Sequence, residues 1–293
     1  MTFMDGKSSL NHKKLCIAIP ASVVSDTPHL REKTSKIGLI GRTAAIFRVD
    51  EIIIYPDIPE TNQRAEIELI AVLLEYMETP QYLRKRLFKL KPELQYAGIL
   101  PPLRTPHHPL NRKIQNLRIG EYREGAALSK TTEGTLVDIG LEKPAILRNK
   151  AIQFGERVTV KVVEVDKQVN VELADRSQIS DYWGYTVNME KQPLGKTLKN
   201  RNFDLVIGTS KYGAPFGNVV SEVSQKWTKG ETIAVVFGAP SQGLNEIVKR
   251  EGISLNDVMN FVVNTIPEQG TETVRTEEAL LASLAILNVN FRA

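Results

Sequence analysis

The sequence predicts an α/β protein built on a parallel sheet, with a small all-β domain inserted into it. Two stretches of the chain alternate short apolar runs with helical patterns, which is the arrangement of a parallel α/β sheet. Between them, the residues up to about Leu173 lack a helical period and show strand patterns separated by turns. Three later apolar runs are each followed at once by a loop rich in glycine or proline.

The first α/β stretch contains two strands and three helices. In chain order they are a strand over Leu15–Ile19, a helix over Leu30–Arg48, a strand over Glu51–Tyr55, and helices over Thr61–Met77 and Gln81–Lys89. The second strand ends at Pro56, which has no N–H to give to a sheet. This alternation predicts strands that run parallel.

The composition of the sequence changes after Tyr96, where four prolines and two adjacent histidines occupy Gly98–Pro109. Five short strands follow, over Gly120–Lys130, Thr135–Ile139, Ala145–Leu147, Arg157–Val165 and Val169–Leu173. Five strands within about 75 residues suit a small Greek-key barrel such as an OB-fold, and an SH3-like barrel fits nearly as well. We therefore expect a discontinuous α/β domain over residues 1–102 and 179–293, and an inserted barrel over residues 103–178.

The second α/β stretch begins near Tyr182 and holds three pairs of a strand and a loop. The strands are Phe203–Ile207, Thr232–Phe237 and Val258–Val263, and the loops after them are Gly208–Gly213, Gly238–Gly243 and Asn264–Gly270. A helix is expected over Thr276–Leu287. Because the carboxyl ends of parallel strands lie at one edge of a sheet, the three loops should form one crevice.

Basic residues gather near the start of the expected barrel, although the net charge of the whole chain is only +4. Between Arg84 and Arg118, nine basic residues accompany one acid, Glu93. Such clustering is the footprint expected for binding a phosphate backbone, and a solvated helix end followed by a basic linker is the alternative. The residues expected to contact RNA are Arg84, Lys85, Arg86, Arg104, His107, His108, Arg112 and Lys113.

Several other kinds of site are disfavoured. Cys16 is the single cysteine and lies in an apolar strand, so neither an intrachain disulfide nor a covalent cysteine mechanism is expected. No Cys/His spacing matches a zinc site, so we expect no metal. Glu190 stands where a P-loop needs its first glycine, and no strand is followed by G-x-G-x-x-G. No apolar run could cross a membrane, so a cytoplasmic protein is expected, or a nuclear or nucleolar one in a eukaryote.

Three segments carry a resemblance to a known family. They read NTIPEQGTETVRTEEALL at Asn264–Leu281, FGAPSQGL at Phe237–Leu244 and TPHHPL at Thr105–Leu110. In order and spacing they are similar to the SPOUT, or α/β-knot, methyltransferases, and within these to the archaeal and eukaryotic RNA methyltransferases with an OB-like domain inserted in the knotted domain. The resemblance implies a trefoil-knotted parallel sheet with helices on both faces, which is a rare exception to unknotted topology.

The resemblance also implies that the three loops hold S-adenosylmethionine. An adenine needs backbone partners in an apolar slot, and glycines let the main chain approach a ligand closely. Ordinary turn chemistry after a strand is the alternative for any single loop. The residues expected to bind the cofactor are Thr209, Ser210, Phe237, Gly238, Ala239, Pro240, Gly243, Asn264, Thr265, Ile266, Pro267, Gly270, Thr271 and Val274.

A second resemblance lies at Lys36–Ile52, which reads KIGLIGRTAAIFRVDEI. It is similar to the first motif of the SpoU-type branch of SPOUT enzymes, in which the arginine, here Arg42, handles the RNA target. Lys36 stands where that motif normally has asparagine. This departure weakens the inference of ribose 2′-O methylation and leaves base methylation at least as well supported.

Arg42, Glu277 and Arg275 are the candidate catalytic residues. Arg42 stays protonated near neutral pH, so we expect it to clamp a phosphate or orient the nucleotide, with a surface salt bridge as the alternative. If the methyl acceptor is a base nitrogen, its proton goes to Glu277 or to the target's own phosphate; otherwise Glu277 is a first-turn charge that stabilises its helix. Arg275 can pair with the cofactor carboxylate or with RNA phosphate.

The residues and the resemblance together predict a S-adenosylmethionine-dependent methyltransferase that acts on ribosomal RNA. The leading expectation from the resemblance is a base, at N3 of uridine, and the ribose 2′-oxygen is an alternative. A noncatalytic RNA-binding or ribosome-assembly factor is the rival from another class, and a protein methyltransferase is a weaker one. The resemblance also implies a homodimer with the last helix across its axis. Packing within one subunit explains the apolar residues of that helix equally well: Ala279, Leu280, Leu284 and Leu287.

Overall fold

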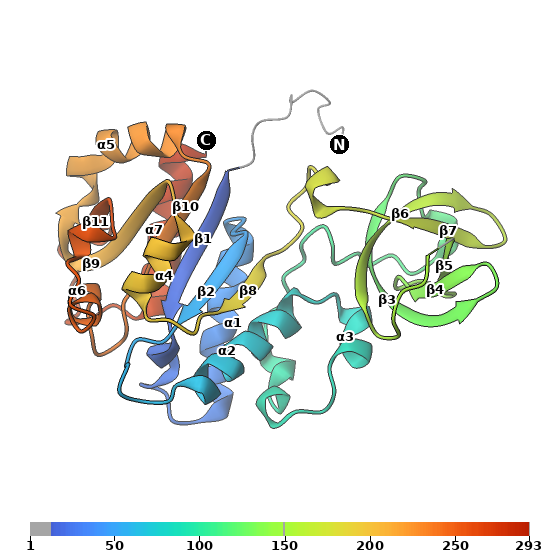
Figure 1. Ribbon diagram of the computed structural model, residues 1–293, viewed down its shortest axis with the longest axis horizontal. Coiled ribbons are helices and arrows are strands. Elements are labelled where there is room, and N and C mark those ends of the chain that lie inside the picture. Colours follow the sequence, from blue (N-terminus) through green and yellow to red (C-terminus); the bar gives the residue numbers. More distant parts are fainter. Residues whose placement is uncertain (1–12, 149, 293) are drawn as a thin grey trace. The chain divides into compact units, whose positions relative to one another are not determined.

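The computed structural model describes residues 13–148 and 150–292 of the chain (Figure 1). The chain divides into two compact units, each made of more than one segment. The sheet unit comprises Met1–Glu75, Tyr96–Pro101 and Tyr185–Ala293. The barrel unit comprises Tyr76–Gln95 and Pro102–Gly184.

The sheet unit is built on six parallel strands, which confirms the predicted parallel α/β sheet. The strands are β1 (Lys14–Pro20), β2 (Glu51–Tyr55), β8 (Thr186–Met189), β9 (Leu205–Pro215), β10 (Thr232–Val236) and β11 (Phe261–Asn264). Their order is β11-β9-β10-β1-β2-β8, and every neighbouring pair is parallel. The edge strand β8 was missed by the sequence analysis, because its side chains are largely exposed and form no apolar run.

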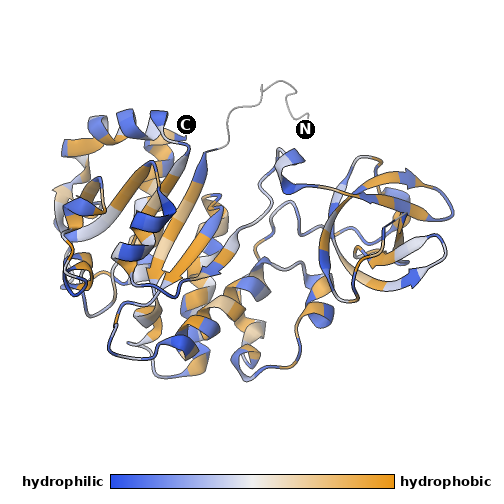
Figure 2. Cartoon of the chain, in the orientation of Figure 1, coloured by the Kyte–Doolittle hydropathy of each residue, from blue (hydrophilic) through white to orange (hydrophobic). Residues whose placement is uncertain are grey.

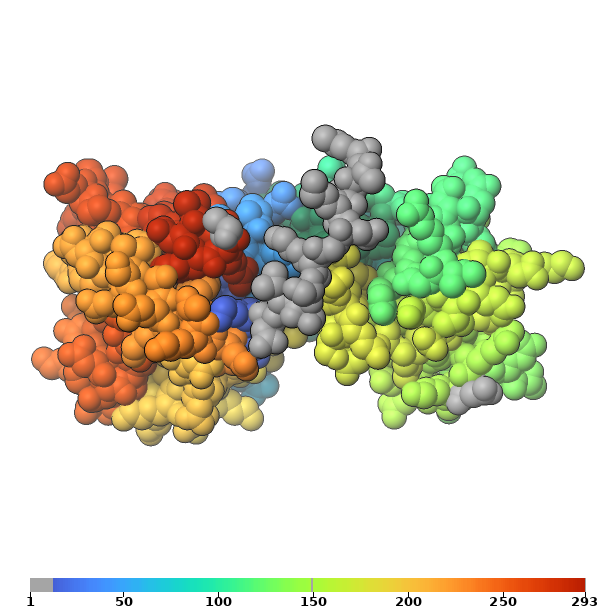
Figure 3. All heavy atoms as spheres, turned by 90° about the horizontal axis from the view of Figure 1, so that it is seen from above, coloured from blue at the N-terminus to red at the C-terminus, as the bar shows by residue number. Residues whose placement is uncertain are grey.

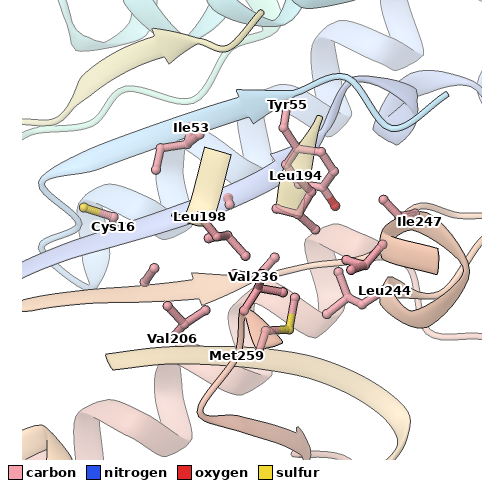
Figure 4. Packing of buried hydrophobic residues seen from close by; sticks show 14 residues of the cluster. Cys16, Ile53, Tyr55, Leu194, Leu198, Val206, Val236, Leu244, Ile247 and Met259 are labelled. Atoms are coloured by element: carbon pink, nitrogen blue, oxygen red, sulfur yellow. The ribbon is translucent and has the colours of Figure 1, made fainter. Parts of the chain in front are cut away.

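Helices cover both faces of this sheet. They are α1 (Leu30–Ile46), α2 (Arg64–Glu78), α4 (Leu194–Arg201), α5 (Phe216–Lys229), α6 (Leu244–Lys249) and α7 (Thr276–Phe291), of which α2 continues into the barrel unit. On one face Tyr55 and its neighbours pack against Leu194 of α4 and Ile247 of α6 (Figure 4). Ile52 and Ile54, which point the opposite way along β2, are also fully buried. Strands buried on both faces are apolar along their length (Figure 2), as expected for a parallel sheet.

Two features of the sheet unit bear on its chemistry. Cys16 is fully buried in β1, and burial raises the pKa of its thiol to about 12, so little thiolate exists at neutral pH. Helix α7 lies beside α5 (Figure 3), where the rings of Phe291 and Trp227 stack with centroids 4.9 Å apart. This contact fixes the carboxyl-terminal half of α7 within its own unit.

The barrel unit contains a closed five-stranded barrel, as predicted. Its strands are β3 (Tyr122–Thr131), β4 (Gly134–Asp138), β5 (Ala145–Arg148), β6 (Arg157–Val165) and β7 (Val169–Leu173). They close in the order β3-β4-β5-β7-β6, with β5 and β7 parallel, which is consistent with an OB-like domain. Valines from β4, β6 and β7 dominate the core, because the inward positions alternate with polar ones along each strand.

A buried ion network joins this barrel to the end of α2. Arg157 of β6 donates from Nε to Glu124 at 2.6 Å and from Nη1 to Glu78 at 2.6 Å. Glu124 also accepts from the indole N–H of Trp183 at 2.6 Å. Burial alone would raise the pKa of Glu78, but the hydrogen bond from His107 and the charge of Arg157 outweigh burial and lower it to about 2. Both carboxylates therefore remain charged inside the unit.

The two adjacent histidines complete this network rather than face solvent. His107 is fully buried, and the Nε2 atoms of His107 and His108 lie 2.9 Å and 2.7 Å from the carbonyl oxygen of Glu78. Burial and the neighbouring His107 lower the pKa of His108 to about 4. Gly184 has a φ of +85°, and a Cβ there would lie 2.6 Å from Cε1 of His107. Glycine is thus needed where the chain leaves the unit.

We expect Arg157→Met to destabilise the barrel unit by about 3 kcal/mol, because it removes the nearest cation of two buried carboxylates and leaves them only Arg176, whose Nη2 lies 3.6 Å from Glu78 and 3.7 Å from Glu124. Arg148→Met is the matched control. Arg148 is more than half exposed and lies 3.6 Å from the exposed Glu164, so its loss should cost no more than about 1 kcal/mol. Urea unfolding followed by Trp183 fluorescence in a Trp227→Phe background measures both. Equal losses for the two variants would contradict this account of the network.

Candidate functional site

Three segments of the sheet unit, one within β9 and the others after β10 and β11, meet around one cavity of about 300 Å³. They come from the carboxyl ends of β9, β10 and β11, with the start of α7 closing one side. The residues that line the cavity are Thr209, Ser210, Lys211, Tyr212, Phe237, Gly238, Ala239, Pro240, Ser241, Gln242, Gly243, Leu244, Glu246, Asn264, Thr265, Ile266, Gln269, Thr273, Val274, Thr276 and Ala279. The segments are far apart in sequence, and the parallel sheet brings them to the same edge.

Most of the residues expected to bind the cofactor lie in this cavity wall. The structure places the expected residues of the first two segments there, together with Asn264, Thr265, Ile266 and Val274. Pro267, Gly270 and Thr271 belong to the third segment but are not among the lining residues. Sequence reasoning missed ten of the lining residues, all of which lie within or next to the same three segments: Lys211, Tyr212, Ser241, Gln242, Leu244, Glu246, Gln269, Thr273, Thr276 and Ala279.

The segment Gly208–Gly213, which was expected to be a loop, lies within the bounds of β9. The strand β11 pairs with Gly208 and next with Ala214, and β10 pairs no further than Gly208, so Thr209–Gly213 form an unpaired insertion in this part of the sheet. A Cβ at Gly213 would lie 2.6 Å from the carbonyl carbon of Val263. Glycine here therefore serves the close approach of two backbones, and the residues before it still line the cavity.

The segment after β10 is held by buried backbone contacts. Tyr55 is fully buried and donates its hydroxyl to the carbonyl oxygen of Phe237 at 2.6 Å. Burial raises the pKa of Tyr55, so the hydroxyl keeps its proton. The N–H of Phe237 donates to the carbonyl oxygen of Ala18 at 3.0 Å, and that of Ala239 to Gln242 at 2.9 Å. The turn is thus anchored to β1 and β2 and has a fixed shape.

The segment after β11 is tied to β9 and to α7. The side-chain amide of Asn264 donates to the carbonyl oxygen of Lys211 at 3.0 Å, and its Oδ1 accepts from the N–H of Ile266 at 2.9 Å. The hydroxyls of Thr265 and Ser283 lie 2.8 Å apart. Thr276 at the start of α7 donates to the carbonyl oxygen of Gly238 at 3.3 Å. These bonds join all three segments into one wall.

The cavity offers a polar atom to a ligand. Among the described residues, the buried Oε1 of Gln242 has no hydrogen-bond partner, although Gln242 lines the cavity. A buried acceptor without a donor is unfavourable by about 1–3 kcal/mol, so a ligand with an N–H group would gain by satisfying it. At Gly243, no heavy atom lies within 4 Å of where a Cβ would be, which leaves room beside the main chain.

The three candidate catalytic residues lie on or beside α1 and α7. Glu277 is 9% exposed in the first turn of α7, where its Oε2 lies 3.5 Å from Nζ of Lys36. Lys36 is 6% exposed and also donates to Asp26 at 2.7 Å. Arg42 is half-buried on α1, the same helix as Lys36. Arg275 is exposed just before α7, and its backbone N–H donates to the carboxylate of Glu278 at 2.9 Å. The structure thus brings Glu277 together with Lys36, which was noted only as a departure from a motif.

The residues expected to contact RNA divide into two groups in the barrel unit. Lys85, Arg104, Arg112 and Lys113 are exposed. The others have protein partners. Arg84 donates to the carbonyl oxygens of Met77 and Thr79 and lies over the ring of Tyr76, and Arg86 pairs with Asp138. His107 has no exposed surface, and His108 bonds to Glu78, so we leave both histidines out of the candidate RNA surface.

Within residues 13–148 and 150–292, no group of three or more His, Cys, Asp or Glu side chains could hold a metal ion. None of the helices in these ranges is both long and apolar enough to pass through a membrane.

Comparison with known proteins connects the cavity to a family. The family model described as "Putative RNA methyltransferase" matches residues 14–287. An uncharacterised protein of Halobacterium salinarum is 32% identical, over 93% of this chain and 98% of its own length. The 28S rRNA (uridine-N(3))-methyltransferase of Drosophila melanogaster is 32% identical, over 97% of this chain and 64% of its own length. The protein of the same name in Mus musculus is 32% identical, over 93% of this chain and 75% of its own length.

The family match spans both units and all three segments of the cavity wall. Relatives that share about a third of the residues over nearly the whole chain come from archaea and from animals. The chain therefore belongs to this family of RNA methyltransferases, as the resemblance in its sequence implied.

Proposed function

We propose that this chain transfers a methyl group from S-adenosylmethionine to N3 of a uridine in ribosomal RNA. The single observation that carries the proposal is the cavity at the carboxyl edge of the sheet, in a member of a family of RNA methyltransferases. The nucleotide is suggested by the printed names of the animal relatives. Lys36 in place of a motif asparagine weakens the case for a ribose and leaves a base at least as well supported.

The residues of the cavity wall fit such a methyl donor. A volume of about 300 Å³ is at the lower end of the range for small-molecule sites. The unpartnered Oε1 of Gln242 suits a ligand amine, and the open space beside the main chain at Gly243 allows a close approach. The donor supplies a methyl group that its sulfonium already makes electrophilic. The protein then has mainly to orient the reactants and remove a proton.

Arg42, Glu277 and Arg275 are the groups that we assign to the RNA target. Arg42 holds a phosphate or orients the nucleotide through its planar guanidinium. Glu277, next to the cavity-lining Thr276 in the first turn of α7, is the group that we assign to accept the proton of the base nitrogen. Arg275, exposed beside the cavity wall, pairs with RNA phosphate or with the donor carboxylate.

We infer that the barrel unit binds RNA and that the sheet unit carries a trefoil knot. Exposed Lys85, Arg104, Arg112 and Lys113 supply positive charge for a phosphate backbone, and OB-like barrels commonly bind single strands. The knot rests on the resemblance to α/β-knot enzymes. A backbone trace through β9–α7 in an electron-density map would test it. A trace in which no part of the chain passes through a loop would refute it.

We also propose that the protein is a homodimer. Helices α1 and α7 pack on each other and leave large apolar side chains exposed, such as Ile46 at 52% and Leu281 at 48%. Exposed apolar side chains on adjoining helices suit an isologous contact between two copies. The resemblance to SPOUT enzymes supports a contact that includes the last helix.

Sedimentation velocity should show one species of twice 32.8 kDa for the wild-type protein. The double variant Ile46→Asp with Leu281→Asp should weaken association by at least about tenfold, because it would bury two carboxylates at the contact. Met189→Asp is the control, since Met189 is 48% exposed on the edge strand β8. A monomeric wild-type protein would refute the dimer. An equal loss of association in the double variant and in Met189→Asp would refute it as well.

Calorimetry should detect binding of S-adenosylmethionine to the wild-type protein, and Gln242→Met should weaken it about tenfold by removing one hydrogen bond. The unfolding free energy should not fall, and should rise by up to about 1–3 kcal/mol, because the substitution removes a buried acceptor that has no protein partner. Gln115→Met, at an exposed position of the barrel unit, should leave binding unchanged. An unchanged affinity in Gln242→Met would remove the cavity as the donor site.

Ribosomal RNA that lacks the modification should gain N3-methyluridine when incubated with the protein and S-adenosylmethionine. Mass spectrometry of its nucleosides measures this product. Arg42→Ala should lower the rate at least about tenfold, while Arg31→Ala, an exposed arginine on the same helix, should not. A 2′-O-methylated nucleoside would favour the ribose alternative. Donor binding without transfer to RNA would mark a noncatalytic RNA-binding factor, and label in protein would mark a protein methyltransferase.

A further inference from the structure

Lys36 is a buried lysine that holds two carboxylates from different parts of the sheet unit. Its Nζ lies 2.7 Å and 2.8 Å from the two carboxylate oxygens of Asp26, in the segment before α1, and 3.5 Å from Oε2 of Glu277 in the first turn of α7. Lys36 and Glu277 are 6% and 9% exposed. A lysine is rarely buried unless it is paired, so this arrangement is specific to its partners.

The charges of this cluster do not balance. One ammonium group faces two carboxylates, and Asp26 takes the two shorter contacts. Glu277 is left at the longer distance, and its Oε2 accepts no hydrogen bond from any described residue. Two charged residues lie close to Glu277 in sequence: Arg275 just before α7, and Glu278 next to it on α7. Arg42 lies further along α1. Glu277 therefore has one cation, at a longer distance than Asp26 has, and its Oε2 has no hydrogen-bond donor among the described residues.

The cluster is also coupled to the wall of the cavity. Thr276, next to Glu277, lines the cavity and donates its hydroxyl to the carbonyl oxygen of Gly238 at 3.3 Å. Ala279, one turn along α7, lines it as well. Lys36 therefore fixes the turn of α7 that contributes directly to the cavity.

We propose that Lys36 is a positioning residue that holds Glu277 charged and in place to accept the proton of the methylated nitrogen. This inference rests on the proposed function. In the step, the N–CH₃ bond forms as the S–CH₃ bond breaks, the electron pair of the broken bond stays on sulfur, and the proton of the nitrogen passes to the Glu277 carboxylate. Lys36 is not a reactant in this step. Asp26 competes with Glu277 for the ammonium group of Lys36.

Two substitutions should move the pH dependence of the reaction in opposite directions. Lys36→Met removes the cation, so Glu277 should hold a proton up to higher pH, and the acid limb of the single-turnover rate should move up by about one pH unit or more. Asp26→Asn removes the competing carboxylate, so the same limb should move to lower pH. Lys36→Arg keeps the charge and should keep the limb close to that of the wild-type protein. Glu277→Gln should abolish the limb together with most of the rate.

The experiment measures single-turnover methylation of ribosomal RNA from pH 5 to 9 with the full-length variants, under saturating donor. Calorimetric donor binding and thermal melting of each variant accompany it. A merely structural role of Lys36 would lower the melting temperature or the donor affinity of Lys36→Met and leave the limb in place. Superimposable limbs in Lys36→Met and the wild-type protein, or shifts of Lys36→Met and Asp26→Asn in the same direction, would overturn the proposal.

A second readout separates this inference from the proposed function. The side-chain carboxyl resonance of Glu277 in ¹³C-labelled protein, assigned by its loss in Glu277→Gln, can be titrated without RNA. Its midpoint should rise in Lys36→Met and fall in Asp26→Asn. If the wild-type protein methylates no RNA, the proposed function fails, and the titration alone still decides whether Lys36 controls the charge of Glu277.

Discussion

The parallel pairing of β9 with both β10 and β11 is the constraint on which the cavity depends. It brings the insertion in β9 and the segments after β10 and β11 to one edge of the sheet, although α5 and α6 separate them in the sequence. The pairing with β11 requires an unusually close approach of two backbones at Gly213. Each segment is then fixed by its own bond to the scaffold, of which the hydroxyl of Tyr55 on Phe237 is the most buried. A cavity with such walls is formed before any ligand arrives.

The parts of the fold that follow from short-range patterns were predicted well. Apolar runs such as Glu51–Tyr55 and the alternation along Arg157–Val165 identify strands because side-chain direction repeats within a few residues. The exposed strand β8 and the end of β9 at Ala214 and Pro215 carry no such pattern, since pairing with a distant strand creates them. Glycine after a strand reads as a turn in sequence, whereas Gly213 serves a strand-to-strand contact.

The sequence predicted the three segments of the candidate site, but not the hydrogen bonds and ion pairs that hold them. The three cavity segments were found because glycine and proline mark them, and their joint position follows from the parallel sheet. The bond from Tyr55 and the cluster around Lys36 could not be found, because each joins residues far apart in the chain. The same reason explains why His107 and His108 were assigned to RNA. Nothing near them in sequence reveals that Glu78 and Gly184 enclose them.

The contacts around Glu78 decide which piece of the chain could stand alone as an OB-like module. A fragment cut at the prolines, from about residue 103 to 178, would keep Arg157 and Glu124 but leave behind Glu78, which supplies half of their ion network, and Trp183, which donates to Glu124. Tyr82, whose hydroxyl donates to the carbonyl oxygen of Glu124, would be lost as well. A transplanted module would therefore have to include Tyr76–Gln95 as well as Pro102–Gly184. The first segment could be supplied as a separate peptide, or the two could be joined by circular permutation.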